Sequence, residues 1–226
     1  MVDTAVVLAA GEGTRLRPLT RNRPKPMLPA ANRPILEHVL DALVDAGADH
    51  VVIVVGYKRD RVQGHFGPTY RDVPITYVRQ NKQLGTGHAL LQAREHVEEA
   101  MLVVNGDCLI DETLVRDVCA SFERGDGEPT LAVLEGPDVR QYGAVTLQGS
   151  FIQEIIEKPR TDEYRLINAG IYAFDDDIFE TIDDTPRDEG ELALTETLSR
   201  ELDRGRVRGV ETDGLWVDAS YPWDLL

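Results

Sequence analysis

Apolar residues cluster in short runs along the chain, and these runs alternate with stretches of helical periodicity. The runs have the length of buried strands, whereas the stretches between them repeat apolar residues at the spacing of one helix face. The predicted strands cover residues 4–10, 51–55, 75–78 and 101–104, and the predicted helices cover residues 34–46, 85–97 and 112–123. This βαβ order predicts a mostly parallel sheet covered by helices on both faces, with ligands at the carboxyl ends of its strands.

The second half of the chain has a different pattern. From about residue 129 it is rich in strands, predicted at residues 131–134, 144–147, 151–156 and 169–174. No linker separates the halves, so we expect a single domain over residues 1–226, in which a three-layer α/β/α half to about residue 128 is followed by a β-rich lobe.

Between the first strand and the first helix lies a loop rich in glycine, proline and basic residues. Residues 11–33 carry six basic side chains and one acid, a charge of +5, whereas the rest of the chain carries −21. Such a cationic island predicts an anionic ligand. Gly11 and Gly13 would let backbone N–H groups approach that anion closely. A dinucleotide fingerprint is excluded because Leu16 stands where glycine or alanine is needed, and no Walker A loop follows.

The letters GEGTRLRPLT followed by RPKPM resemble the signature of the sugar-1-phosphate nucleotidyltransferases, of the glucose-1-phosphate thymidylyltransferase and N-acetylglucosamine-1-phosphate uridylyltransferase type. This resemblance implies a Rossmann-like nucleotide-diphospho-sugar transferase fold, with a nucleotide-binding half (about 1–128) and a sugar-binding half (about 129–226). It also implies that Arg15 contacts the triphosphate and that Lys25 bridges the reacting phosphoryl groups. The backbone expected to wrap the nucleotide is Leu8, Ala9, Ala10, Gly11, Gly13 and Thr14.

A second motif, RQNKQLGTGHALL at residues 79–91, joins a predicted strand to a predicted helix. The Gln80 amide offers both a donor and an acceptor, as reading a pyrimidine edge requires, and the Gly85 and Thr86 backbone could supply the remaining bonds. Taken alone, the glycines are explained equally well by a tight turn. The stretch is similar to the Q-x-x-x-L-G-T-G-H-A segment of uridylyltransferases, which favours nucleotide binding; His88 is expected to be structural.

Two aspartates are candidate metal ligands. Asp107 follows a buried strand in the sequence Asn-Gly-Asp, where a carboxylate could hold Mg²⁺ on nucleotide phosphates. The resemblance makes Asp107 the first ligand and Asp218 the second. The family commonly has glycine two residues after this second aspartate, and here stands Ser220, so the turn departs from the family pattern.

The sugar side is expected from three further motifs that follow the family's order. They are Tyr142-Gly143, Glu157-Lys158-Pro159 and Asn168-Ala169-Gly170-Ile171-Tyr172. By resemblance, Tyr142, Gly143, Glu157 and Asn168 contact the sugar, and Lys158 neutralises the acceptor phosphate. Each motif alone is also compatible with a solvated hairpin surface.

The amino-acid composition limits which binding partners and which cellular compartment we expect for the protein. The formal net charge is −16 and the pI is about 4.7, with four lysines against 20 arginines, which suggests adaptation to high salt, as in a halophile. Nucleic acid is therefore not expected as a partner. The sequence shows no signal peptide or membrane span, so a soluble, cytoplasmic protein is expected. The spacing of the two cysteines argues against a disulfide or a zinc site.

These features lead to one main hypothesis: Mg²⁺-dependent transfer of a nucleotidyl group from UTP or dTTP to N-acetylglucosamine 1-phosphate or glucose 1-phosphate. GTP with mannose 1-phosphate is an alternative substrate pair, and a non-catalytic sugar-nucleotide-binding regulatory subunit is an alternative function. Similar proteins continue into helices or an acyltransferase domain, so the chain could be a catalytic domain cut from a longer protein. The oligomeric state, a homo-oligomer included, stays open.

Overall fold

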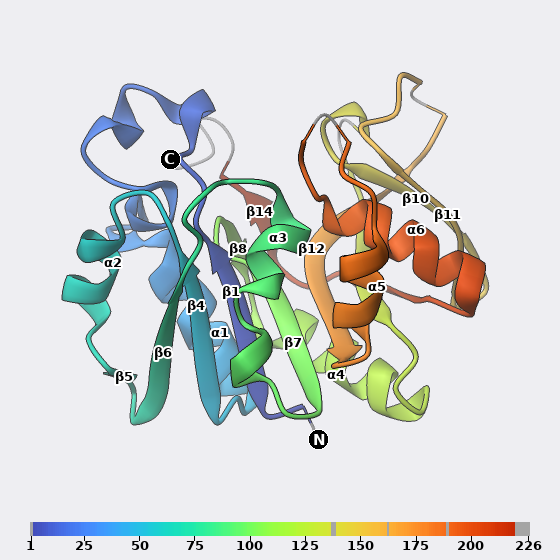
Figure 1. The fold of residues 1–226 in the computed structure, drawn as a ribbon, viewed down its shortest axis with the longest axis horizontal. Coiled ribbons are helices and arrows are strands. Elements are labelled where there is room, and N and C mark those ends of the chain that lie inside the picture. The colour runs from blue at the N-terminus through green and yellow to red at the C-terminus, as the bar shows by residue number, and fades with distance from the viewer. Residues whose placement is uncertain (1, 137–138, 162, 189, 220–226) are drawn as a thin grey trace.

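A mixed sheet of ten strands, with helices on both faces, organises the computed structural model, which describes residues 2–136, 139–161, 163–188 and 190–219 (Figure 1). The strand order is β10-β11-β13-β9-β12-β7-β1-β4-β6-β5. These strands are β1 (Thr4–Ala9), β4 (His50–Val55), β5 (Thr69–Tyr70), β6 (Val73–Arg79), β7 (Ala100–Asn105), β9 (Thr130–Glu135), β10 (Gly143–Gln148), β11 (Phe151–Glu157), β12 (Leu166–Asp175) and β13 (Arg208–Glu211). Two small sheets pair β2 (Pro29–Ala30) with β3 (Arg33–Pro34), and β8 (Cys108–Ile110) with β14 (Trp216–Asp218).

The four main strands of the first half are parallel, as the sequence predicts, and only the two-residue β5 is antiparallel to its neighbour β6. Strand β1 lies between β4 and β7, and β6 extends the parallel set. Because β1 is apolar from Ala5 to Ala9, it can be covered on both faces: Ala5 and Val7 enter one core cluster, while Val6 and Leu8 enter the other. The carboxyl ends of these strands point away from the chain's N-terminus, toward the upper edge of Figure 1.

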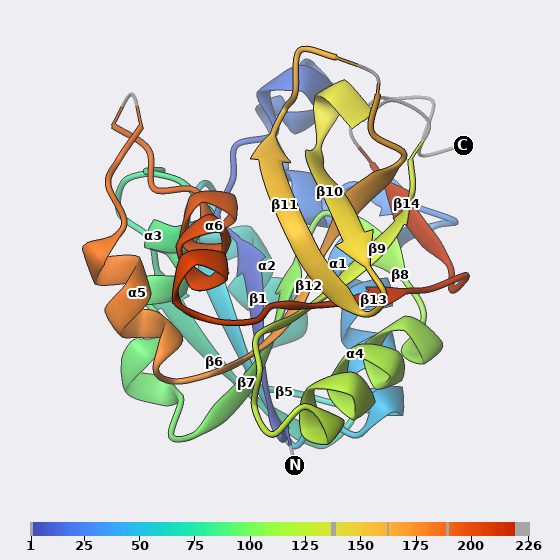
Figure 2. The ribbon, with the colours of Figure 1, turned by 90° about the vertical axis from the view of Figure 1, so that its right-hand side faces the viewer.

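The expectation of a mostly parallel central sheet is not confirmed, because the strands of the second half join the same sheet and many of them are antiparallel. Strand β12 runs antiparallel to both β7 and β9, and β10 is antiparallel to β11. Among the described residues between β9 and β12 there is no α-helix. Parallel neighbours need a long crossover, whereas antiparallel ones need only a turn. Strand β13 returns parallel to β9 after two helices. Figure 2 shows this half with β10 and β11 toward the viewer.

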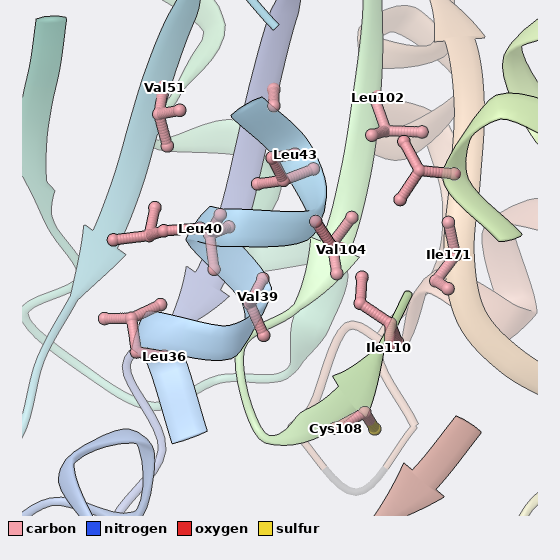
Figure 3. Close-up of a cluster of buried hydrophobic side chains, with 14 of the residues drawn as sticks. Leu36, Val39, Leu40, Leu43, Val51, Leu102, Val104, Cys108, Ile110 and Ile171 are labelled. Carbon is pink, nitrogen blue, oxygen red and sulfur yellow. The ribbon is translucent and has the colours of Figure 1, made fainter. Parts of the chain in front are cut away.

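Helices cover the two faces of the sheet separately. The helices are α1 (Ile35–Ala46), α2 (Arg59–Phe66), α3 (Thr86–Leu91), α4 (Glu112–Arg124), α5 (Ile178–Asp184) and α6 (Leu194–Arg204). One core cluster gathers the apolar faces of α1 and α4 on the sheet, and the other gathers α3, α5 and α6. Figure 3 shows the first cluster where α1 packs on the strands. The predicted helix at 85–97 is shorter, because α3 ends at Leu91 and a separate 3₁₀ turn follows at Arg94–His96. No helix within the described ranges is long and apolar enough to cross a membrane.

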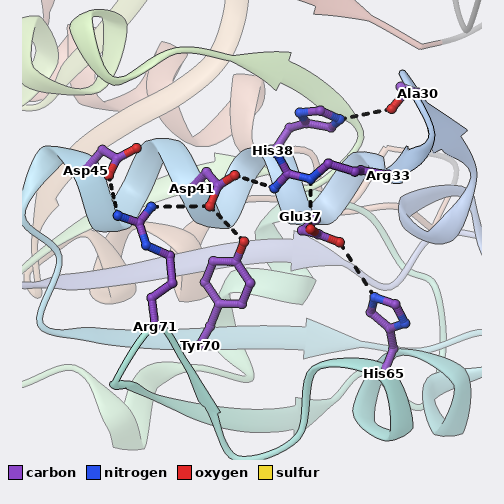
Figure 4. Close-up of polar contacts among 9 residues, drawn as sticks. All are labelled: Ala30, Arg33, Glu37, His38, Asp41, Asp45, His65, Tyr70 and Arg71. Carbon is purple, nitrogen blue, oxygen red and sulfur yellow. Dashed lines mark hydrogen bonds and ion pairs between the residues drawn. The ribbon is translucent and has the colours of Figure 1, made fainter.

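An ion network fastens the outer side of α1 to the two neighbouring hairpins (Figure 4). Arg33, from β3, pairs with Glu37 at 2.8 Å and with Asp41. Asp41 also accepts a hydrogen bond from the Tyr70 hydroxyl at 2.7 Å and contacts Arg71 at 3.3 Å. One carboxylate therefore links the loop that precedes α1 to the β5–β6 hairpin.

Replacing Asp41→Asn should lower the free energy of unfolding at pH 7 by about 1 kcal/mol, because solvent screens these half-exposed contacts. Burial would raise the pKa of Asp41, but hydrogen bonds from Arg33 and Tyr70 lower it below 3.8. The stabilisation is therefore complete well above the ordinary pKa of an aspartate and is lost as the pH falls through the lower, folded-state pKa.

Urea unfolding of the wild type and Asp41→Asn between pH 7 and pH 2.5 checks this expectation. The two curves should converge at the acid end. Asp45→Asn is the control, because Asp45 contacts Arg71 at 2.7 Å at an exposed position and should cost less. A constant difference between wild type and Asp41→Asn across the range would contradict the assignment.

Candidate active site

A cavity of about 400 Å³ opens at the carboxyl ends of β1 and β7, between the parallel and antiparallel halves. Both halves contribute to it, and so does the cationic loop after β1. Its lining comprises Leu8, Ala9, Gly11, Gly13, Thr14, Arg15, Leu16, Lys25, Pro26, Asn105, Asp107, Cys108, Gln141, Tyr142, Lys158, Asn168, Ala169, Trp216 and Asp218. The structure thus brings together most of the site residues that the sequence predicts.

The loop after β1 folds as short 3₁₀ turns around Gly13. This glycine has φ +62°, a left-handed conformation that side chains disfavour, and its carbonyl accepts a 2.9 Å hydrogen bond from the Thr20 hydroxyl. A Cβ atom on Gly13 would lie 2.8 Å from Cβ of Lys25. The absence of a side chain at Gly13 therefore lets Lys25 pack directly beside the predicted phosphate loop.

Lys25 ends between the two predicted metal ligands. Its Nζ donates to Asp107 Oδ2 at 2.7 Å and to Asp218 Oδ1 at 3.3 Å, and the lysine is 8% exposed. Burial would lower the pKa of Lys25, but the two carboxylates outweigh it and raise the pKa to about 12. The ammonium therefore stays charged at neutral pH.

A two-stranded ribbon explains how residues 111 positions apart meet. Asp107 lies in the turn between β7 and β8, and β14 pairs antiparallel with β8 so that Asp218 is opposite Cys108. The Gly106 N–H donates to the Leu8 carbonyl at 3.0 Å, which fastens this turn to β1. Burial raises the pKa of the Cys108 thiol well above its ordinary value, so it remains protonated and a poor nucleophile.

The two carboxylates fit a Mg²⁺ ion, because both already converge on a single cation, the Lys25 ammonium. No group of three or more His, Cys, Asp or Glu side chains suited to a metal occurs in the described part of the chain. A divalent ion at this pair would take further ligands from phosphate and water, as Mg²⁺ commonly does. Ser220, where the family pattern differs, lies outside the described residues.

The second half contributes a polar wall opposite the loop. The Tyr142 hydroxyl donates to Asp218 Oδ2 at 3.1 Å, and its ring packs edge-on against Trp216. Lys158 lines the cavity with φ +45°, and its N–H donates to the Tyr142 carbonyl. The Asn168 amide donates to the Tyr172 hydroxyl and accepts from the Gly170 N–H, so these bonds fix its orientation at the cavity wall.

Gly143 and Glu157 lie just outside the lining. They face each other in the β10–β11 register, and Glu157 contacts the Lys158 ammonium at 3.1 Å. The Thr195 hydroxyl donates to the other oxygen of Glu157 at 3.0 Å. Sequence reasoning missed Thr195, because α6, which carries it, was not predicted. Its charged, amphipathic pattern was the available signal.

The residues predicted to read the nucleotide base lie in a loop next to this cavity, which hydrogen bonds and close packing hold in place. Gln80 is 4% exposed, and its Nε2 donates to the Gly85 carbonyl and lies 2.9 Å from His88 Nδ1. Gly85 has φ +98°, and a Cβ there would lie 2.4 Å from the Leu192 carbonyl oxygen. The Thr86 hydroxyl accepts from the backbone at the start of α6. Ala10 connects the two loops, since its carbonyl accepts from the side chain of Gln83. Gln80, Gly85, Thr86 and Ala10 lie outside the lining, and their role in nucleotide binding stays a prediction.

Comparison with known proteins identifies the family. The family described as Nucleotidyl transferase matches residues 4–225. The chain belongs to this family. The UTP–glucose-1-phosphate uridylyltransferase AglF of Haloferax volcanii is 38% identical over 97% of this chain and 92% of its own length. The bifunctional protein GlmU of Methanococcus maripaludis is 36% identical over 98% of this chain and 52% of its own. The chain thus spans about half the length of the GlmU relative.

Solved structures of nucleotidyl transferases share the fold. A putative glucose-1-phosphate thymidylyltransferase from Bacillus anthracis superposes with a TM-score of 0.91 at 27% identity, over 98% of this chain and 92% of that one. A UDP-glucose pyrophosphorylase complexed with UDP-glucose has a TM-score of 0.91 at 24% identity. The mixed sheet described above is therefore the architecture of this group.

Two glycines of the loop offer a matched test of the packing at Lys25. Gly13→Ala should lower the free energy of unfolding by about 2 kcal/mol, because the new Cβ meets Lys25 and the left-handed backbone is strained. Gly11→Ala should change it by less than about 0.5 kcal/mol, because a Cβ at Gly11 has no atom within 4 Å. Denaturant titration of both variants measures the difference, and equal stabilities would refute the packing argument.

Proposed function

We propose that this chain transfers a nucleotidyl group from UTP or dTTP to glucose 1-phosphate or N-acetylglucosamine 1-phosphate, releasing pyrophosphate. The observation that carries the proposal is the cavity itself. Its lining includes the glycine loop with Arg15, Lys158 with Tyr142, and the Lys25–Asp107–Asp218 cluster. A triphosphate and a sugar phosphate need two such cationic regions facing one reaction point.

The chemistry requires no side-chain base. The acceptor phosphate oxygen is already anionic at neutral pH, so it can attack the α-phosphorus directly while the bond from the α-phosphorus to the bridging oxygen breaks. Pyrophosphate leaves with that electron pair. The obstacle is repulsion, since two like unit charges 4 Å apart cost about 4 kcal/mol at an effective dielectric constant of 20. We propose that Arg15, Lys25 and Lys158, which all line the cavity, offset it.

We also propose Mg²⁺ as the cofactor, held by Asp107 and Asp218, whose carboxylates converge on one point. Bound there, the ion would neutralise phosphate charge and orient the phosphoryl oxygens. Tyr142 keeps Asp218 aimed at that point through its second oxygen. The high acidic content further leads us to propose that the protein works at high salt in the cytoplasm.

UTP with glucose 1-phosphate is the leading pair. The support is the AglF relative, which matches nearly its whole length and is named for that reaction. dTTP is the nearest competitor, because a pocket discriminates one methyl group by only about 1 to 3 kcal/mol. The proposed sugar contacts are Glu157, Gly143, Tyr142 and Asn168.

Pyrophosphate release in molar KCl with Mg²⁺ tests the assignment. UTP, dTTP, ATP, GTP and CTP would each be combined with glucose, N-acetylglucosamine and mannose 1-phosphates. We expect release to require both substrates and to be fastest with UTP and glucose 1-phosphate. A folded protein that binds a nucleotide but releases no pyrophosphate with any pair would instead be a sugar-nucleotide-binding regulatory subunit.

Lys25→Ala should lower turnover by roughly 100 to 1,000-fold, because it removes a cation placed to stabilise the transferring phosphoryl group. Lys58→Ala is the matched control, since Lys58 lies over the Tyr57 ring, outside the cavity, and its loss should leave the rate unchanged. Steady-state kinetics of both variants decide the point. An unaltered rate in Lys25→Ala would remove this lysine from catalysis.

A further inference from the structure

A buried ammonium occupies the space where two carboxylates converge. Lys25 Nζ lies 2.7 Å from Asp107 Oδ2 and 3.3 Å from Asp218 Oδ1, and the side chains of Lys25 and Asp218 are each 10% exposed. A divalent cation that bridged the same two carboxylates would need the same space. The ammonium and the metal are therefore alternatives at this point.

We propose that Lys25 keeps the metal site closed until a nucleotide arrives, so that a divalent cation binds Asp107 and Asp218 only after the ammonium has moved to the triphosphate. The identity of that triphosphate rests on the proposed function, but the competition between ammonium and metal does not.

The geometry of Lys25 allows this exchange without movement of the backbone. Its Cβ is packed against Gly13, so the side chain starts beside the phosphate loop. The flexible four-carbon stem can then direct the ammonium either to the carboxylates or to an anion on the loop. Gly11, Gly13 and Thr14 line the same cavity as Lys25, which places both destinations in one space.

Charge makes the exchange depend on phosphate. In the structure one positive charge faces two carboxylates, and a divalent cation would balance them completely. Displacing the ammonium without giving it another anion leaves a buried cation unpaired, which is costly. A triphosphate supplies that anion and also offers oxygen ligands to the metal. Nucleotide and metal should consequently strengthen each other's binding, and the coupling must be reciprocal.

A second hydrogen bond holds the Asp218 carboxylate in position independently of Lys25. Its Oδ1 contacts Lys25, whereas its Oδ2 accepts from the Tyr142 hydroxyl at 3.1 Å. This second bond comes from Tyr142, the residue just before β10, whereas Asp218 lies in the separate β8–β14 sheet. Departure of the ammonium therefore need not release the carboxylate, and the metal position persists.

Titration of nucleotide-free protein with Mn²⁺, followed by calorimetry and by electron paramagnetic resonance, tests the competition. We expect Lys25→Met to bind Mn²⁺ at least tenfold more tightly than the wild type, because the methionine vacates the carboxylates. Lys158→Met is the matched control: Lys158 lines the same cavity but contacts Glu157 at 3.1 Å. Its affinity should stay within threefold of the wild type. Equal affinity in wild type and Lys25→Met, or an equal gain in Lys158→Met, would overturn the proposal.

A measurement on the wild type covers the case in which Lys25→Met does not fold. The chain has only four lysines, so an NMR spectrum of labelled lysine Nζ and Cε contains four sites, which single substitutions of the other three assign. Mg²⁺ alone should leave the Lys25 signal in place, and Mg²⁺ with bound tripolyphosphate should shift it. A shift with Mg²⁺ alone, or none once tripolyphosphate is bound, would contradict the exchange.

Neither experiment requires turnover, which separates this inference from the proposed function. A protein without transferase activity that still shows the exchange would refute the function and retain the inference. An active transferase whose Mn²⁺ affinity does not depend on Lys25 would support the function and refute the inference.

Discussion

The contact between the Lys25 ammonium and the carboxylates of Asp107 and Asp218 is the constraint around which the site is built. Three separate segments supply these residues: the loop after β1, the turn after β7, and β14 near the end of the described chain. Without the cation, the carboxylates of Asp107, whose side chain is 38% exposed, and of the buried Asp218 would repel each other, at a cost in stability. Without the carboxylates, a buried ammonium would be unpaired. Each segment thus helps to hold the others, and the cavity is arranged around their meeting point.

The mixed sheet has a consequence for how two anionic substrates could be brought together. The parallel half ends its strands beside the cationic loop, in the manner of many phosphate-binding α/β proteins. The antiparallel half contributes Tyr142, Lys158 and Asn168, which come from turns and strands packed against the same opening. The fold thus separates a proposed donor side from a proposed acceptor side while keeping both within one cavity.

Much of the first half could be predicted from the sequence, because its strands are continuous apolar runs and its helix α1 has a clear apolar face. Most of the loop residues that line the cavity could also be predicted, because glycines and cations mark this loop within a short stretch of sequence. The second half was predicted as a β-rich lobe, but its antiparallel strand directions and its joining to the central sheet were not, because strand orientation depends on connections rather than on composition.

Other features had no local signal. The ribbon of β8 and β14 depends on pairing between residues about a hundred positions apart, and its strands are only three residues long. Thr195 was missed because its importance comes from facing Glu157, which no spacing rule reveals. The sequence could name Asp107 and Asp218 by resemblance, but it could not show that a lysine stands between them.

The antiparallel pairing of β12 with β7 joins the two halves along five residue pairs, from Ile171–Val104 to Asp175–Ala100. Main-chain hydrogen bonds across such a ladder make the halves one rigid plate, with neighbouring strands about 4.8 Å apart. A hinge motion that separated the two halves would break the hydrogen bonds between β7 and β12. Opening and closing of the cavity must therefore depend on the loops around its entrance. Insertions or substitutions in those loops could change which ligands the cavity admits without changing the spacing of the strands beneath it.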